Sequence, residues 1–289
     1  MMRVPIMALA ATLACVAAQA QEPARVTFPS ADGRTMLTGY VFMPTARSAR
    51  MPAVVMMHGR AGAYSKKAGG RYEAATISAR HRTWGALWAA QGFVAVLVDG
   101  FGPRGYPAGF PRFSYDVRPD AVNETTARPL DAYGALAWLR GRDDIAADRI
   151  GLHGWSNGGS AALATMAAGA GVMPPGSLKG FAAALAFYPG CRLRGRFDRT
   201  GYRPSGPVRV FHGTADEETS ARRCLRLVER SRKLGGDIAI TLYPGATHGF
   251  DDPGPVRQRV AANRAARADA VAHAQRFFAE RLIAAAPAP

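Results

Sequence analysis

The sequence lacks the features that mark several large classes of protein. Its 289 residues include three cysteines, and no two of them are spaced as Cys-x-x-Cys. No two histidines are spaced as His-x-x-x-His. Beyond the first 20 residues, no apolar run is long enough to cross a bilayer. We therefore expect no metal site, no membrane span and no cofactor.

Acidic residues and lysines are both scarce. The chain has 21 Asp and Glu against 37 Lys and Arg, which gives a formal net charge of +16. Only four of the basic residues are lysines, and the arginines are scattered along the chain. Nucleic-acid-binding arms usually cluster their charge or interleave it with aromatic residues. We expect a solvated basic surface and no nucleic-acid partner, with attraction to anionic envelope surfaces or acidic substrates left open.

The first 20 residues differ from the rest of the chain. Arg3 supplies a positive charge, residues 4–18 are apolar and rich in alanine, and Ala18-Gln19-Ala20 has the form of a cleavage site. A lipoprotein leader with Cys15 as the lipidated residue is the alternative. We expect residues 1–20 to be a signal peptide cleaved near Ala20, and the protein to be exported, either periplasmic or secreted.

The remaining chain, residues 21–289, alternates between two patterns. Short apolar runs end at Gly-containing loops, which is typical of strands buried on both faces of a parallel sheet, and helical stretches lie between them. The apolar runs are 52–57, 93–98, 149–152, 181–187, 208–211 and 238–243, preceded by an antiparallel pair at 25–28 and 36–42; the helical stretches are 82–91, 130–139, 158–168, 219–234 and 256–283. The alternation predicts one α/β domain with a mostly parallel sheet and helices on both faces.

Residues 101–128 do not fit this alternation. The segment is rich in proline, glycine and aromatic residues and is too long for a plain loop. In an open α/β sheet, function collects at the carboxyl ends of the strands, so we expect this segment to be a wall or lid over a site there. Four arginines in or beside it are candidates either for attracting a substrate carboxylate or for plain surface charge: Arg104, Arg112, Arg118 and Arg128.

A candidate nucleophile lies in Gly154-Trp155-Ser156-Asn157-Gly158, which has the form Gly-x-Ser-x-Gly. A candidate strand leads into this segment, and an alanine-rich candidate helix follows it. In that context the flanking glycines let the chain turn sharply, so that the serine occupies a strained and exposed apex. The sequence therefore predicts Ser156 as a nucleophile.

A serine nucleophile needs a base, and the base needs a carboxylate that holds its tautomer. His248 follows the last predicted strand, whereas we expect packing or surface roles for the other five histidines. Asp216, in the loop after the preceding strand, is our candidate acid. We attribute Glu217 and Glu218 to interaction with a helix N-terminus, and Asp99 to a contact with a loop backbone.

The oxyanion that forms during acyl transfer needs two backbone N–H donors. One normally belongs to the residue after the nucleophile, which is Asn157, and the other to the loop after the third strand. That loop is His58-Gly59-Arg60-Ala61-Gly62, where glycines allow a close approach of the backbone. We expect Arg60 to supply the second donor.

Taken in order, five segments of the chain resemble the dienelactone hydrolase family of α/β-hydrolases. The segments are 54–59, 97–105, 154–159, 212–216 and 245–250, and the resemblance covers nearly all of the mature chain. It implies an eight-stranded sheet without a large cap domain and a triad of Ser156, Asp216 and His248. Members that cleave dienelactone carry a cysteine at the elbow and a glutamate after the third strand, where this chain has Ser156 and Gly59. The chain resembles an exported, serine-type relative.

Two cysteines, Cys191 and Cys224, remain once Cys15 leaves with the leader. An even count in an oxidising compartment favours a disulfide. Cys191 follows one predicted strand and Cys224 opens the helix after the next, so both should lie near the same edge of the sheet. We expect them to form a disulfide, with two unpaired core cysteines as the alternative.

The leading interpretation is a carboxylic ester hydrolase that forms an acyl-Ser156 intermediate and acts on a small-molecule ester, with an anionic substrate as one option. A peptidase of the prolyl-oligopeptidase kind is an alternative, although such enzymes usually carry an additional large domain. A catalytically inactive basic binding module on the same fold is another, but it gives no reason to retain serine, acid and histidine in order. The sequence indicates no oligomeric state.

Overall fold

The computed structural model describes residues 22–168 and 180–283, which contain an eight-stranded sheet in the order β1-β2-β4-β3-β5-β6-β7-β8. β2 is antiparallel to its neighbours β1 and β4, and the other neighbouring strands are parallel. The strands are β1 (Ala24–Pro29), β2 (Met36–Phe42), β3 (Met51–Met57), β4 (Val94–Asp99), β5 (Ile145–Trp155), β6 (Ala183–Phe187), β7 (Val208–Gly213) and β8 (Ile238–Tyr243). The predicted α/β class, the antiparallel start and the strand count are confirmed.

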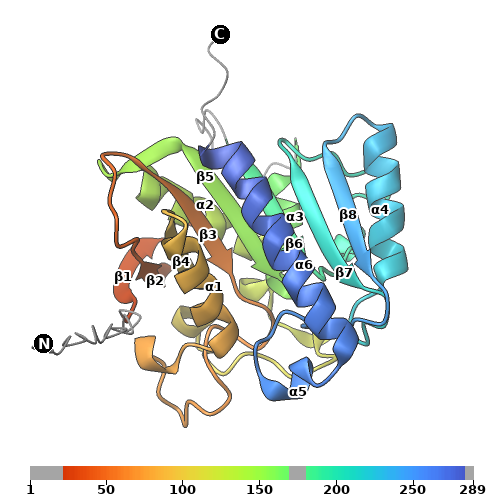
Figure 1. The fold of residues 1–289 in the computed structure, drawn as a ribbon, viewed down its shortest axis with the longest axis horizontal. Helices are drawn as coiled ribbons and strands as arrows, with labels where there is room; N and C mark the ends of the chain where they lie inside the picture. Colours follow the sequence, from red (N-terminus) through yellow and green to blue (C-terminus); the bar gives the residue numbers. More distant parts are fainter. Residues whose placement is uncertain (1–21, 169–179, 284–289) are drawn as a thin grey trace, which may run out of the picture.

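Helices cover both faces of the sheet (Figure 1). α1 (Ala79–Ala90) and α6 (Ala261–Phe278) pack on one face, and α2 (Ala127–Arg140), α3 (Asn157–Met166) and α4 (Ala221–Lys233) pack on the other. Short 3₁₀ turns lie in the connections: η1 (Ala74–Thr76), η2 (Gly102–Arg104), η3 (Tyr115–Val117), η4 (Asp120–Val122) and η5 (Leu193–Gly195). The core is therefore two hydrophobic layers, one on each side of the sheet.

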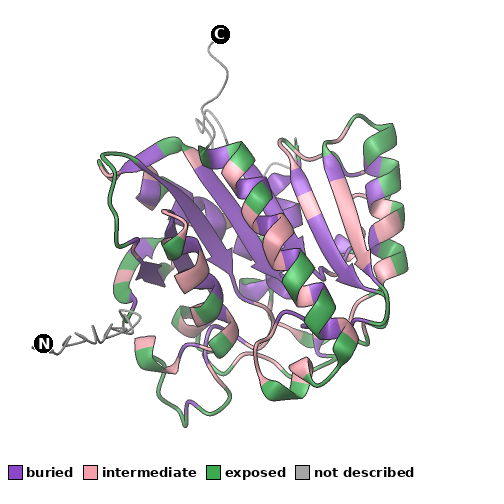
Figure 2. Cartoon of the chain, in the orientation of Figure 1, coloured by how far each residue is buried: buried purple, intermediate pink, exposed green. Residues whose placement is uncertain are grey.

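β3 shows why the central strands are apolar throughout. Val54 and Met56 pack in the layer beneath α1 and α6, whereas Val55 and Met57 pack in the opposite layer. Successive side chains of a strand point to opposite faces, and both faces are covered here, so every position must be apolar. In Figure 2, β3 is accordingly buried along its length, while exposed residues lie on the outward sides of the helices.

The predicted single helix over 256–283 is wrong, because Val260 has an extended backbone with φ of −78° and ψ of 117°. The segment instead forms α5 (Pro255–Gln258), α6 and a π-helical turn (Ala279–Ile283). Asn263, in the first turn of α6, is fully buried; its side chain accepts the N–H of Thr247 at 2.8 Å and donates to the carbonyl of Arg257 at 2.9 Å. The break lets this buried amide satisfy its hydrogen bonds in the loop after β8.

Cys191 and Cys224 form a disulfide, with 33 residues of sequence separation. Cys191 lies after β6, Cys224 lies in α4, and the parallel neighbours β6 and β7 bring both to the same edge of the sheet. The loop that the bridge closes contains Asp216. In the chain-entropy model a closed loop of this size contributes roughly 3 to 4 kcal/mol to the free energy of unfolding.

The predicted signal peptide, residues 1–20, and Cys15 lie outside the described residues. Within residues 22–168 and 180–283, no helix combines the length and apolar character needed to cross a bilayer. The single-domain boundary expected at residue 21 also falls just before the described part of the chain, which begins at Glu22.

Candidate active site

The chain turns sharply between β5 and α3, and Ser156 lies at that turn. Its φ of 53° and ψ of −116° fall in a region that residues with a Cβ rarely occupy. A Cβ on Gly154 would overlap the carbonyl of Gly158, and a Cβ on Gly158 would overlap the carbonyl of Met57. Only glycine fits on either side of the serine, which is the reason for the Gly-x-Ser-x-Gly pattern here.

The structure brings Ser156, His248 and Asp216 into hydrogen-bond contact. His248 Nε2 lies 3.0 Å from Ser156 Oγ, and His248 Nδ1 lies 2.9 and 3.1 Å from the two carboxylate oxygens of Asp216. The His248 ring is buried and packs edge-on against the Tyr188 ring, with 4.6 Å between centroids. With its proton on Nδ1, the imidazole donates to Asp216 and accepts from the Ser156 hydroxyl.

Asp216 accepts further hydrogen bonds that fix its orientation. Its Oδ1 accepts the backbone N–H of Glu218 at 2.8 Å and of Thr219 at 2.7 Å, and the Thr219 hydroxyl donates to Oδ2 at 3.0 Å. Burial raises the pKa of Asp216, but hydrogen bonds from His248 and from the Thr219 backbone outweigh burial and hold the pKa below its ordinary value. The carboxylate is therefore ionised at neutral pH.

The two predicted oxyanion donors come from segments that flank Ser156. Asn157 lies in the first turn of α3, where backbone N–H groups have no intrahelical acceptor. On the other side, a Cβ on Gly59 would lie 3.4 Å from Ser156 Cβ and 3.3 Å from the carbonyl oxygen of Trp155. The backbone N–H of Arg60 has no backbone acceptor in the described part of the chain. Because Gly59 lies so close to Ser156 and Trp155, position 59 has little room for a larger side chain.

A buried network that sequence reasoning missed holds the side chain of Asn157. Arg128 Nη1 donates to Asn157 Oδ1 and to the carbonyl of His58, each at 2.7 Å, and Asn157 Nδ2 donates to Glu124 at 3.0 Å. Arg128 is completely buried, and burial lowers its pKa to about 10. Arg128 therefore connects the loop after β3 to the first turn of α3.

The four arginines considered for substrate attraction have different positions. Arg128 is buried in the network above, Arg104 pairs with Asp131 at 2.8 Å, and Arg112 pairs with Glu218 at 2.8 Å. Arg118 lines the cavity that contains Ser156. The surface-charge interpretation is wrong for Arg104 and Arg128, because both guanidinium groups have buried partners.

Glu217 and Glu218 do not occupy the first turn of α4, so their predicted role at a helix N-terminus is wrong. Glu217 accepts the backbone N–H of His248 at 2.9 Å. Glu218 accepts two hydrogen bonds from the Arg60 guanidinium, at 2.7 and 2.9 Å, and its Oε2 lies 3.9 Å from His248 Nε2. Burial raises the pKa of Glu218, and the Arg60 hydrogen bond with nearby positive charge offsets this and lowers it. The loop of Asp216 thereby joins the loops of Arg60 and His248.

Asp251 is a second buried group that sequence reasoning missed. It lies three residues after His248, is 1% exposed, and accepts the indole N–H groups of Trp84 at 2.8 Å and Trp155 at 2.9 Å, together with the Tyr188 hydroxyl at 2.5 Å. Trp155 is the last residue of β5, and the Tyr188 ring packs on the imidazole. Asp251 therefore connects the three segments that carry or contact Ser156 and His248.

Ser156 opens into a cavity of about 290 Å³. Phe113, Tyr115 and Arg118 form one wall, so the segment 101–128 lies at the site as expected, and Cys191 lies on another wall. Figure 1 shows this connection, in yellow, below the carboxyl ends of the central strands. The disulfide is thus part of the cavity wall.

The remaining histidines and Asp99 lie outside the hydrogen-bond chain of Ser156, His248 and Asp216. His58, His81, His153 and His212 are buried, as expected for packed histidines. Asp99 accepts the backbone N–H groups of the two loop residues at 101 and 102, at 3.1 and 2.8 Å, as the sequence predicts. Within the two described ranges, no group of three or more His, Cys, Asp or Glu is arranged to hold a metal ion.

Comparison with known proteins places these features in a family. The sequence model of the dienelactone hydrolase family matches residues 37–282. Among solved structures, a dienelactone hydrolase-like promiscuous phosphotriesterase from metagenomic libraries shares 18% identity, with a TM-score of 0.65 over 89% of this chain and 97% of its own. A thermophilic esterase from Thermogutta terrifontis with propionate bound shares 21% identity, with a TM-score of 0.61 over 93% and 97%. A putative dienelactone hydrolase from Klebsiella pneumoniae shares 15% identity, with a TM-score of 0.63 over 89% and 99%. These likenesses show the fold.

Proposed function

This chain belongs to the dienelactone hydrolase family, and on that premise we propose that it is a serine hydrolase that cleaves carboxylic esters through an acyl-Ser156 intermediate. The observation that carries the proposal is the unbroken hydrogen-bond chain from Ser156 through His248 to the ionised Asp216. The cavity beside the serine gives a small ester access to it. A catalytically inactive module has no use for this arrangement.

The proposed reaction has two steps. His248 accepts the hydroxyl proton at Nε2 as Ser156 Oγ attacks the ester carbonyl carbon, and the backbone N–H groups of Arg60 and Asn157 donate to the developing oxyanion. The C–O bond to the alcohol breaks, and the alcohol leaves with the proton held by His248. A water molecule then loses a proton to His248 and attacks the acyl carbon. The bond between this carbon and Ser156 Oγ breaks, Oγ takes the proton back from His248, and a carboxylic acid is released.

Asp216 stabilises the imidazolium that forms in each step, because it accepts from His248 Nδ1 and stays ionised. Glu218 adds a second negative charge near the other ring nitrogen. Dienelactone is a poor candidate substrate, since the family members that cleave it use a cysteine and a glutamate where this chain has Ser156 and Gly59. The close packing of Gly59 against Trp155 leaves little room for that glutamate.

We further propose that the protein is exported after cleavage behind Ala20. The disulfide supports this proposal, because such bonds persist mainly in oxidising compartments. The leader pattern at residues 1–20 is the independent support.

Ser156→Ala should leave the protein folded and lower kcat for p-nitrophenyl acetate by on the order of 10³ or more, and His248→Ala should lose a comparable amount, because nucleophile and base act as a unit. Ser48→Ala, at an exposed serine between β2 and β3, is the matched control and should keep full activity. Steady-state kinetics and circular dichroism provide the measurements. An alanine variant at Ser156 that is folded and retains most of the activity would show that another residue is the nucleophile.

The pH profile tests the base. Protonated His248 cannot accept the serine proton, so kcat/KM should fall as the pH is lowered. The pKa of Asp216 lies below its ordinary value, so this carboxylate stays ionised near neutral pH. Its protonation should therefore not be the cause of the fall in kcat/KM. A profile that stays flat between about pH 5 and 9 would argue against a histidine base.

Intact mass tests export and the disulfide together. Protein recovered from its native host should begin at Gln21, and alkylation in denaturant without reductant should add no group, because both mature cysteines are bonded. Treatment with reductant before alkylation is the control and should add two. A retained Met1 would contradict export, and two groups added without reductant would contradict the disulfide.

A further inference from the structure

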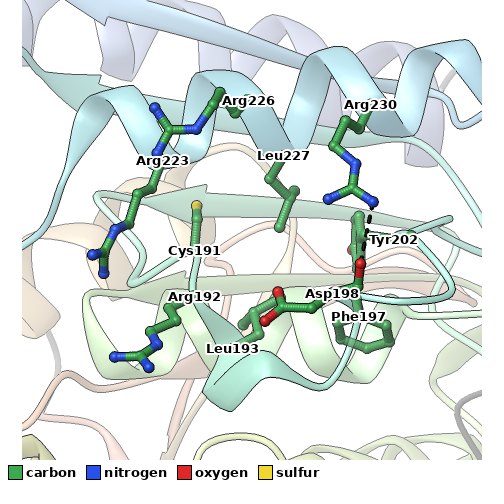
Figure 3. Close-up of a pocket in the computed structure, with 11 residues that line it drawn as sticks. Cys191, Arg192, Leu193, Phe197, Asp198, Tyr202, Arg223, Arg226, Leu227 and Arg230 are labelled. Carbon is green, nitrogen blue, oxygen red and sulfur yellow. Dashed lines mark hydrogen bonds between the residues drawn. The ribbon is translucent and has the colours of Figure 1, made fainter.

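A second cavity lies beside the one that contains Ser156. It has a volume of about 420 Å³ and lies between α4 and the connection from β6 to β7 (Figure 3). Leu193, Phe197, Tyr202 and Leu227 provide apolar surface in it. The lining thus offers space for an alkyl chain or a ring.

Basic residues surround this apolar surface. Four arginines line the cavity, against a single acid, Asp198, among the described residues; the arginines are Arg192, Arg223, Arg226 and Arg230. Arg223, Arg226 and Arg230 belong to α4, and they lie on one face of it because residues three and four apart share a face of a helix. The cavity is therefore strongly electropositive, and it favours a negatively charged group.

Most of these guanidinium groups have no partner among the residues that the structure describes. Arg230 donates to the backbone carbonyl of Asp198 at 3.3 Å, the contact dashed in Figure 3. Within the same part of the chain, Arg192, Arg223 and Arg226 make no side-chain hydrogen bond or ion pair. Their donors can therefore bind a carboxylate, which accepts two parallel hydrogen bonds from a guanidinium.

The two cavities share a wall. Cys191, Arg192 and Arg223 line both of them. Arg192 follows Cys191 in sequence and Arg223 precedes Cys224, so the disulfide holds the backbones of the two arginines close together where the two cavities meet. In Figure 3 both side chains extend toward the same side of the cavity, away from Phe197 and Tyr202. A ligand that starts at Ser156 can therefore continue past these arginines.

We propose that the second cavity is a substrate subsite, and that it binds the far, carboxylate-bearing end of the acyl chain whose ester carbonyl is attacked by Ser156. This assignment rests on the proposed function. The apolar surface holds the middle of the chain, and Arg226 and Arg230 bind its terminal carboxylate. The preferred substrates are thus monoesters of elongated dicarboxylic acids.

The test uses mono-p-nitrophenyl esters of linear dicarboxylic acids, from succinate to dodecanedioate, and the same compounds with the far carboxyl capped as a methyl ester. At pH 8 and low ionic strength, kcat/KM for the free acid should exceed that for the capped compound by about tenfold once the chain is long enough, which is the effect of one charge-assisted hydrogen bond. Succinate, which is too short to reach the cavity, should show no such preference.

Substitutions on α4 locate the preference. Arg226→Gln with Arg230→Gln should bring the ratio of free acid to capped compound close to one for the long chains. Arg222→Gln removes the same kind of charge from an exposed position on α4 outside the cavity lining, and it should leave the ratio unchanged. Circular dichroism checks that each variant is folded.

The outcomes separate the two proposals. Cleavage of p-nitrophenyl acetate and of the capped esters without any preference for the free acids would overturn the subsite alone. A preference that survives the double substitution, or that Arg222→Gln reduces equally, would also overturn it, because general surface charge would then be the cause. If wild type cleaves none of the esters, the proposed function is wrong and the subsite falls with it.

Discussion

The structure depends on one steric constraint, the positive φ of Ser156 at the end of β5. The turn is possible only because Gly154 and Gly158 let α3 pack directly on the end of the strand and on the loop after β3. The same close packing involves Gly59, whose backbone approaches Ser156. The turn therefore brings three features to one point. They are an accessible serine, the N-terminus of α3 and the glycine-containing loop after β3.

Buried carboxylates fix the loops around that point. Asp216 orients His248, Glu218 joins its own loop to Arg60, and Asp251 ties the end of β5 to the loop of His248. Glu124 completes the set through its contact with Asn157. A buried carboxylate that is fully hydrogen-bonded specifies a single arrangement of its donors, since any other arrangement leaves a charge without partners. The geometry at the serine thus depends on contacts between segments that are distant in sequence.

Sequence patterns predicted the features that are local. Each buried strand was marked by an apolar run with a glycine after it, and Ser156, Asp216 and His248 followed from their places after such strands in a fixed order. Asp251 carried no comparable signal, because its three donors lie 63 to 167 residues away. The break before α6 was equally invisible, because it lies at Val260 and not at a helix-breaking residue, and it accompanies hydrogen bonds that the buried Asn263 amide makes to Thr247 and Arg257.

Covalent labelling tests the central claim most directly. An alkyl fluorophosphonate reacts with an activated serine, whose oxygen bonds to phosphorus as fluoride leaves, and the adduct persists because water attacks it slowly. Mass analysis of digested protein should find one adduct, on the peptide that contains Ser156, and none in His248→Ala. An intact, folded protein that remains unlabelled, or a label on another residue, would contradict the claim that Ser156 is the activated nucleophile.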